Sequence, residues 1–241
     1  MQVIDYHQPT VYFPQSTVHS PQSTVHSPQS TVHNTMHLNF TTAAPIDRYK
    51  ILTAVVVPRP IAWITTTDRK GRINAAPFSF FNAVGTDPAL VAISIGDRRP
   101  GVPKDTARNI RSTREFVINL VTGKNAAAMN VTAAEFEEGV DELAKAGLTT
   151  LPSVQVTPPR IAESPVHLEC REVQTIEIGR NRIVIGEVVE VHIDDAYYDG
   201  SKGYVATERL DAVGRMHGRG WYSGTSDLFE ISRVKPEDVG D

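Results

Sequence analysis

Cysteine, long apolar runs and signal-like N-terminal residues are scarce in this sequence, and each shortage excludes a class of protein. Cys170 is the only cysteine among 241 residues. It excludes an internal disulfide and a zinc site built from cysteines, and it is typical of a reducing compartment. No apolar stretch approaches the roughly 20 residues that span a bilayer. The N-terminal region lacks the basic and apolar blocks of a secretory signal and the arginines of a transit peptide. We therefore expect a cytoplasmic protein with no membrane partner.

Net positive charge is also missing. The chain has 24 basic and 28 acidic side chains, a formal net charge of −4, whereas a protein that binds nucleic acid needs a basic surface for the phosphate backbone. Nucleic acid is therefore not an expected partner. Hydrophobic residues make up 40% of the chain, which is enough to fill the core of one large domain or two small ones.

A seven-residue unit, PQSTVH followed by Ser or Asn, repeats three times over residues 14–34. Each unit has one valine and one proline, so it can build neither the apolar seam of a coiled coil nor a solenoid core. We predict a disordered, low-complexity tail over residues 1–35 and a folded domain over residues 36–241. The repeat histidines have no thiolate or carboxylate beside them, so we interpret them as solvated side chains rather than metal ligands. They are His19, His26 and His33.

Beyond the tail, β-branched runs bounded by turn residues dominate the sequence. Gly71 closes one hairpin turn, and Gly179 opens another between the two longest runs. In the last run, from Ile183 to Ile193, isoleucine and valine fall on odd positions, which is typical of a strand with one buried and one wet face. The expected strands are residues 51–57, 61–67, 74–82, 90–95, 115–121, 166–178 and 182–193.

Helical signals are fewer and shorter. Asp105 or Thr106 can cap a helix that runs to about residue 112, residues 125–136 are rich in alanine, and residues 141–146 end at Gly147, which suits a C-cap. The chain therefore fits a mainly β fold, an antiparallel barrel with short helical insertions. Strands do not alternate with helices as in a parallel α/β sheet, so a Rossmann fold is disfavoured.

The charge pattern singles out the segment from Asp97 to Arg114. It holds six basic and two acidic side chains, and Lys104-Asp105-Thr106 falls where a helix begins. A helix N-terminus with a hydroxyl and an ammonium group suits a phosphate monoester. A solvated basic helix face explains the same charges equally well.

Two further segments could line a ligand site. Residues 74–82, NAAPFSFFN, offer small side chains, a proline and three phenylalanines, which suit a flat heteroaromatic ring. The alternative is a strand that packs its phenylalanines into the core. Residues 215–222, RMHGRGWY, combine cationic and aromatic groups in a glycine-broken loop that fits a pocket mouth or a surface turn. Cys170 alternates with apolar neighbours, and we expect it in the core rather than as a nucleophile.

Taken in order, these motifs resemble the flavin reductase-like FMN-binding split-barrel proteins. The resemblance rests on PRPIAWITT at residues 58–66, NAAPFSFFN at residues 74–82, and Lys104-Asp105-Thr106 followed by Asn109. It implies an antiparallel split barrel that binds FMN and pairs as a homodimer. Such proteins use NAD(P)H to reduce flavin, and some supply a partner flavin-dependent monooxygenase. Others are flavoredoxins, which pass electrons on.

The resemblance also implies roles for particular residues. Lys104, Thr106 and Asn109 would hold the FMN phosphate, with Asp105 beside them. The residues that would line the isoalloxazine ring are Asn74, Ala75, Ala76, Pro77, Phe78, Ser79 and Phe80, and those that would flank the ribityl chain are Ala62, Trp63, Ile64 and Thr65. The substrate side would be formed by Arg215, His217, Gly218 and Tyr222, with His217 at the nicotinamide or the pyrophosphate.

Three functions remain open at this point. Hydride transfer from a nicotinamide to a flavin depends on stacking and proximity more than on acid–base help, so no residue is assigned as a catalytic acid or base. The leading interpretation is an FMN-dependent NAD(P)H oxidoreductase. The alternative is a flavoredoxin-like FMN electron carrier without its own nicotinamide site. A third interpretation is a binding module for a different ligand.

Overall fold

The computed structural model describes residues 35–137 and 139–235. The chain divides into two compact units, Met1–Thr41 and Thr42–Asp241. In the first unit only residues 35–41 are described, and they form neither helix nor strand. Apart from Thr35, the predicted tail and its three histidines lie outside the described residues.

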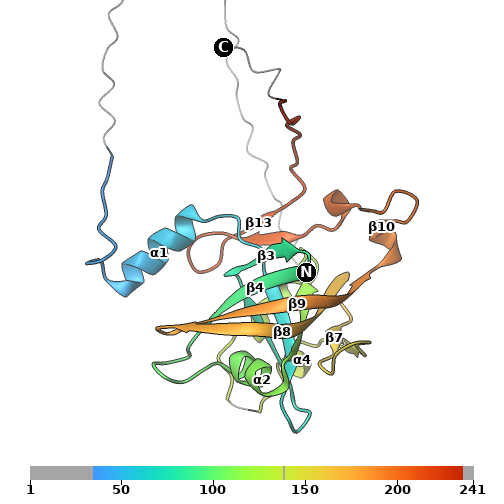
Figure 1. Ribbon diagram of the computed structural model, residues 1–241, viewed down its shortest axis with the longest axis horizontal. Coiled ribbons are helices and arrows are strands. Elements are labelled where there is room, and N and C mark those ends of the chain that lie inside the picture. The colour runs from blue at the N-terminus through green and yellow to red at the C-terminus, as the bar shows by residue number, and fades with distance from the viewer. Residues whose placement is uncertain (1–34, 138, 236–241) are drawn as a thin grey trace, which may run out of the picture. The chain divides into compact units, whose positions relative to one another are not determined.

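The second unit is built on one antiparallel sheet of seven strands (Figure 1), as the strand pattern predicted. The order of strands across the sheet is β2-β1-β5-β8-β9-β4-β3. Their bounds are β1 Ala62–Thr67, β2 Ile73–Phe78, β3 Phe81–Thr86, β4 Ala89–Gly96, β5 Glu115–Leu120, β8 Val166–Ile178 and β9 Asn181–Ile193. Two-residue or three-residue strands form three further pairs, β6 Thr150–Leu151 with β7 Arg160–Ile161, β10 Tyr198–Asp199 with β11 Tyr204–Val205, and β12 Val213–Arg215 with β13 Tyr222–Gly224.

The two edges of the sheet meet at one corner. β2 and β3 are the edge strands, yet only Ser79 and Phe80 separate them in the chain. The sheet must therefore curl until both edges come together there, and the backbone N–H of Ser94 on β4 donates to the carbonyl of Phe80 across 2.8 Å. Away from this corner no strand of the described chain joins the edges. The result is a split barrel.

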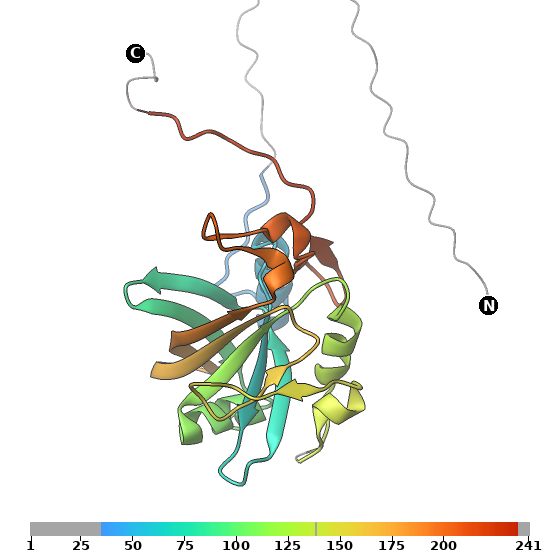
Figure 2. The same cartoon turned by 90° about the vertical axis from the view of Figure 1, so that its right-hand side faces the viewer.

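In the described part of the chain four α-helices accompany the sheet: α1 Pro45–Val55, α2 Asp105–Thr113, α3 Ala126–Thr132 and α4 Glu142–Lys145. Two 3-10 turns, η1 Asp195–Tyr197 and η2 Thr207–Arg209, lie in the C-terminal third. Figure 2 shows α3 and α4 beside the strand β2. In the part of the chain that the structure describes, no helix has the length and apolarity that a bilayer crossing needs.

Two apolar clusters share the strand β1, whose six residues are all buried. One cluster fills the barrel and contains Ile64, Ile93, Phe116 and Cys170. The other lies on the opposite face, under α3 and α4, and contains Trp63 and Met129. Cys170 is fully buried, and burial raises the pKa of its thiol, so the expectation of a core cysteine is confirmed.

The strand predicted at residues 51–57 is wrong, because residues 45–55 form α1. Pro45 stands in the first turn, where its missing N–H costs the helix nothing. At the other end Nη1 of Arg59 donates to the carbonyls of Thr53 and Val56, each across 2.6 Å. The arginine that makes these contacts lies outside the β-branched run, and its bonds to the end of the helix act against the local preference of that run.

Three boundary predictions also need correction. Residues 74–82 are not one strand, since the barrel corner at Ser79 and Phe80 divides them into β2 and the start of β3. The helix predicted at residues 125–136 ends at Thr132. The N-cap of α2 is Lys104, and neither Asp105 nor Thr106 caps the helix. The predicted glycine positions are confirmed, with φ of +79° at Gly71, +67° at Gly147 and +58° at Gly179.

The predicted inner face of β9 is wrong as well. The even positions Val184 and Gly186 are buried, whereas Val191 is 48% exposed. A Cβ on Gly186 would lie 2.5 Å from the Phe116 ring, so this strand approaches the core too closely for any side chain there. Irregular pairing of β8 with β9 between Glu169 and Cys170 shifts the alternation along the hairpin.

Candidate functional site

A groove runs along the outer edge of β2. It consists of two adjoining pockets of about 520 and 560 Å³ that share Pro77 and Ala133. The first pocket lies at the N-terminus of α2 and is lined by Asn74, Ala76, Lys104, Asp105 and Thr106. The second lies at the β12–β13 hairpin and is lined by Phe78, Ser79, Arg215 and Tyr222. The structure thus brings ten of the predicted site residues to one groove, these nine and Pro77, which both pockets share.

The backbone of β2 explains why the groove follows this strand. One side of β2 pairs with β1, and no strand of residues 35–137 and 139–235 pairs with the other side. The Ala75 N–H points outward, because it donates to Oε2 of Glu142 rather than to β1. Backbone groups alternate along a strand, so Pro77 faces outward too, and its missing N–H removes no bond of the ladder.

The α2 end of the groove suits an anion. Lys104 is the N-cap of the helix and its side chain makes no capping hydrogen bond, so it leaves the N–H groups of the first turn open to a ligand. The Lys104 ammonium lies 5.6 Å from the centroid of the Phe78 ring, and among the described residues no carboxylate pairs with it. Lys104 therefore presents an uncompensated cation beside a helix N-terminus.

Four of the five arginines of the basic segment pair with carboxylates. Asp105 accepts from two of them, and its contact with Nη2 of Arg98 measures 3.0 Å. The pairs are Arg98 with Asp105, Arg108 with Asp105, Arg111 with Glu177, and Arg114 with Glu172. Most of the excess positive charge of this segment is therefore neutralised locally. Lys104 is the cation of the segment that lines the groove without a carboxylate partner among the described residues.

A polar network joins β2, α2 and α4 beneath this pocket. The Asn74 amide satisfies both neighbours when its Oδ1 accepts from the Thr106 hydroxyl (3.0 Å) and its Nδ2 donates to Oε1 of Glu142 (3.3 Å). Thr106 is 1% exposed. Burial raises the pKa of the Glu142 carboxyl above its usual value, although the Ala75 N–H partly offsets this. The Glu142 carboxyl group therefore lies in the same pocket as the Lys104 side chain, in addition to the carboxylate of Asp105.

The other end of the groove is the β12–β13 hairpin. Nη2 of Arg215 donates to the carbonyl of Gly218 (3.0 Å), and its guanidinium carbon lies 4.7 Å from the centroid of the Tyr222 ring. Gly218 has a φ of +64°, which permits this tight loop. The exposed ring of His217 stacks on Trp221 with a centroid separation of 6.1 Å. The loop thus offers cationic and aromatic surface at the end of the groove.

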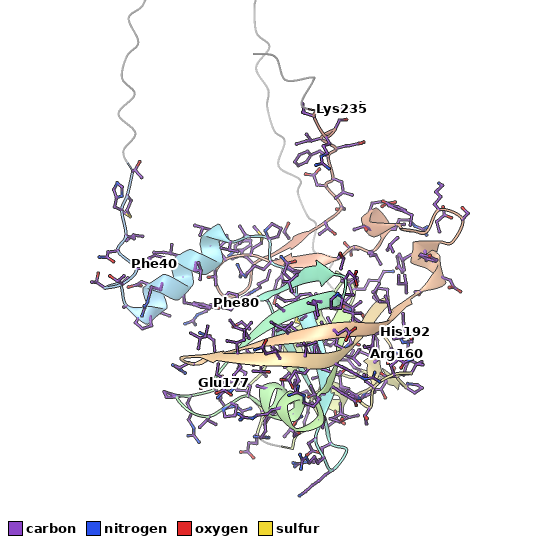
Figure 3. The ribbon with its side chains drawn as sticks, viewed as in Figure 1. Phe40, Phe80, Arg160, Glu177, His192 and Lys235 are labelled. Atoms are coloured by element: carbon purple, nitrogen blue, oxygen red, sulfur yellow. The ribbon has the colours of Figure 1, made fainter. Side chains whose placement is uncertain are left out.

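Several residues singled out from the sequence lie away from the groove. The side chains of Ala62, Trp63, Ile64 and Thr65 are fully buried in β1. The Trp63 indole N–H donates to Thr132 on α3 across 2.9 Å. Asn109 is also buried and donates to Thr66 across 3.1 Å. Phe80 is 39% exposed and lies on the α1 side of the barrel (Figure 3), 6.0 Å from the Arg59 guanidinium.

Sequence reasoning missed the residues that other elements contribute to the groove. Met129, Asn130 and Ala133 come from α3 and its C-terminal end, and Glu142 comes from α4. No local pattern marks them, because their contact with β2 arises from packing across 50 residues or more of chain. Arg219 also lines the groove, and its place in the RMHGRGWY segment is a signal that could have found it.

Comparison with known proteins defines the class of this split barrel. Residues 54–208 match the family model for the flavin reductase like domain, so the chain belongs to the flavin reductase-like family. A protein of Deinococcus radiodurans is 47% identical over 203 residues, which cover 82% of this chain and 89% of that protein.

Two solved structures share the fold over almost their whole length. Component B of the nitrilotriacetate monooxygenase from Bacillus cereus superposes with a TM-score of 0.78 at 30% identity and covers 82% of this chain and 98% of its own. The 2-nitrobenzoate 2-nitroreductase NbaA from Pseudomonas fluorescens superposes with a TM-score of 0.76 at 29% identity and covers 83% of this chain and 98% of its own. The predicted split barrel and the predicted family are both confirmed.

Proposed function

We propose that the protein is an FMN-binding oxidoreductase that uses NAD(P)H to reduce flavin. The observation that carries the proposal is the groove along the β2 edge, with a phosphate-type site at Lys104 and an aromatic, cationic end at Arg215 and Tyr222. A flavin mononucleotide has the same polarity, a dianionic phosphate at one end and a flat ring at the other. Membership of the flavin reductase-like family supports the same ligand.

The residues of the groove have separable roles in this proposal. Lys104 and the first-turn N–H groups of α2 bind the phosphate, and the Thr106 hydroxyl fixes the Asn74 amide beneath it. Pro77 and Phe78 supply a flat apolar wall for the ring. Bound FMN would supply the two-electron chemistry, since its ring accepts a hydride from a nicotinamide. The guanidinium groups of Arg215 and Arg219 place positive charge at the ring end of the groove, which stabilises negative charge that develops there.

We assign NAD(P)H to the same end of the groove. Arg215 fixes the loop by binding the Gly218 carbonyl, and His217 and Trp221 form a stacked, exposed pair beside it. An exposed aromatic pair next to arginine suits a nicotinamide ring and an anionic pyrophosphate. The chain needs no acid or base for hydride transfer, because the groove contributes proximity and orientation.

Two candidate functions differ in where the electrons of the reduced flavin go. The Bacillus cereus relative is named as a component of a monooxygenase, which supports a protein that releases reduced flavin to a partner monooxygenase. A flavoredoxin-like carrier, which keeps its FMN and lacks a nicotinamide site, remains the second candidate. The exposed His217–Trp221 pair favours the first, since a carrier has no use for a nicotinamide platform.

We also infer a homodimer in the cytoplasm. α1 buries one side chain, Thr53, and leaves Ile46, Tyr49, Leu52 and Val55 between 46% and 68% exposed. An 11-residue helix is marginal on its own, so a second copy that covers these side chains would stabilise it. A single buried thiol and NAD(P)H as donor both fit the cytoplasm.

Absorbance spectra of the full chain test the proposed function. The protein is mixed with FMN under anaerobic conditions, and the flavin band is recorded before and after NADH or NADPH is added. Catalytic bleaching of excess free FMN supports the reductase. Bound FMN that is bleached by a protein reductant but by neither nicotinamide would instead support the carrier, and no change of the FMN spectrum on mixing would contradict flavin binding altogether.

A further inference from the structure

A second cavity, distinct from the groove, lies at the end of the barrel beside β12. Its volume is about 720 Å³, and its wall comes mostly from β5, β8 and β12, together with residues 58–61 and Thr225. Leu120, Leu168 and Val213 help to give it an almost entirely apolar surface. Water inside such a space finds few hydrogen-bond partners, so the cavity favours an apolar occupant.

The last ten described residues start at the wall of this cavity. Thr225 lies in that wall, where its hydroxyl donates to the carbonyl of Ala212 across 2.9 Å. Every residue from 226 to 235, which we call the C-terminal arm, is exposed. Its large apolar side chains are Leu228, Phe229, Ile231 and Val234, with exposed fractions of 58%, 85%, 79% and 63%. The arm therefore leaves an apolar cavity with its own apolar side chains in water.

The arm has the pattern of an extended segment. It forms neither helix nor strand in the described chain. Alternate side chains of an extended segment share a face, so Phe229 and Ile231 lie on one face and Glu230 lies on the other. Two bulky apolar side chains on one face of an extended segment suit insertion into an apolar cavity.

The helix α1 is a second exposed apolar surface near this cavity. Only Val56 and Val57 separate its last residue from Pro58 in the cavity wall. Four of its large apolar side chains, Ile46, Tyr49, Leu52 and Val55, are between 46% and 68% exposed. At about 100 Å² each, these four and the four of the arm amount to about 1,600 Å² in two copies, the size of a stable protein–protein interface.

We propose that two copies of the chain exchange their C-terminal arms, so that Phe229 and Ile231 of each copy fill the apolar cavity of the other. The arm does not fold back onto its own barrel, since all ten of its residues stay exposed there. Every copy carries both the arm and the cavity, so a second copy supplies the partner for each, as a two-fold isologous interface requires. This inference deepens the homodimer inferred above and does not depend on the flavin chemistry.

Photo-crosslinking of the full chain tests the exchange. Benzoylphenylalanine, incorporated in place of Phe229, keeps an aromatic side chain at this exposed position. Irradiation should give a product of twice the mass of the chain, with the cross-link at cavity residues such as Pro58 or Leu168. The same group in place of Val154, which is exposed and lies outside the cavity, should not react with those residues. A cross-link within one chain, a cross-link outside the cavity or no cross-link at all would overturn the proposal.

Sedimentation equilibrium measures what the arm contributes to the dimer. The double variant Phe229→Ser with Ile231→Ser should raise the dissociation constant of the dimer at least about tenfold, because two apolar side chains no longer leave water. Val154→Ser, at another exposed position, is the control and should leave the constant unchanged. All three positions are exposed in the single chain, so the substitutions spare its core. An unchanged dissociation constant in the double variant would refute the exchange.

Reduction of FMN by NAD(P)H, measured on the same samples, separates this inference from the proposed function. A dimer that exchanges arms but does not bind FMN would refute the reductase and leave the exchange standing. A chain that reduces FMN but is a monomer, or is a dimer that the arm variants do not weaken, would refute the exchange and leave the reductase standing.

Discussion

The backbone N–H of Ala75 donates to Oε2 of Glu142 across 3.2 Å, and this bond holds a carboxylate in the pocket that Lys104 lines. Burial raises the pKa of Glu142, and the nearby carboxylates of Asp105 and Asp141 raise it further. An anion that binds at Lys104 must therefore share its pocket with a carboxyl group that already resists ionisation. The strength of phosphate binding depends on both side chains.

Replacing Glu142 by glutamine should strengthen FMN binding. The amide keeps an acceptor for the Ala75 N–H but carries no charge, so the repulsion of the phosphate falls by about 1 kcal/mol, or roughly fivefold in affinity. Flavin fluorescence titration measures the effect. Glu135→Gln is the matched control, because this exposed carboxylate lines the same pocket and is screened by water. Weaker FMN binding in Glu142→Gln would contradict the prediction.

Replacing Lys104 by alanine should weaken FMN binding by about 1.5–3 kcal/mol, because a charge-assisted contact to the phosphate is lost. Riboflavin, which has no phosphate, should bind both proteins alike. The exposed Lys124, outside the groove, gives the control Lys124→Ala. A parallel loss for FMN and riboflavin would show that Lys104 acts on the fold rather than on the phosphate.

Replacing Arg215 by methionine should raise the KM for NAD(P)H about tenfold, because the 216–221 loop loses its anchor at the Gly218 carbonyl and the cation over Tyr222. Steady-state kinetics with saturating FMN measure the change. Arg180→Met, at the exposed tip of the β8–β9 hairpin, serves as the control. If the KM for NAD(P)H is unchanged and the affinity for FMN is reduced, Arg215 binds the flavin and not the nicotinamide.

Acidification should destabilise the protein through His167. Burial lowers the pKa of this histidine, and the Arg160 cation lowers it further, although the bond to the Ile161 carbonyl opposes the shift. The unfolded chain, with a histidine pKa of about 6.5, therefore binds more protons than the folded one. The stability is fully present above that pH and is lost as the pH falls through the lowered pKa.

Urea unfolding at about pH 7.5 and about pH 5.5 measures this loss. His167→Gln, which keeps a donor for Ile161 but does not titrate, should reduce the difference between the two conditions. His37→Gln is the control, since His37 is exposed and lies in the other unit. Equal pH dependence of His167→Gln and the unmodified chain would refute the assignment.

The sequence predicted those elements whose signals are local. The β8–β9 hairpin has two long β-branched runs and a glycine with positive φ between them, and α2 begins where a polar segment meets the end of a loop. The family motifs then brought Lys104 and Pro77 to one site although 27 positions of chain separate them (104 − 77). Local patterns and motifs together were sufficient for the fold and for most of the groove.

What the sequence did not predict depends on contacts between distant residues. The run at residues 51–57 is helical, and Arg59 holds the end of α1. The inner face of β9 lies on even positions, where Gly186 packs against the distant Phe116 ring. Figure 3 shows the two ends of the β8–β9 hairpin, with Glu177 near the tip and His192 at the far end. The groove residues that α3 and α4 contribute, Glu142 among them, could not be predicted for the same reason, because only tertiary packing brings these helices to β2.

The open edge of β2 has a consequence for self-association. Exposed sheet edges normally invite further strands from other molecules. Here an incoming peptide would find the Ala75 donor already engaged by a carboxylate and no donor at all at Pro77, so two of the bonds of a regular ladder could not form. This margin is therefore a poorer template for a further strand, which favours its use by a small molecule.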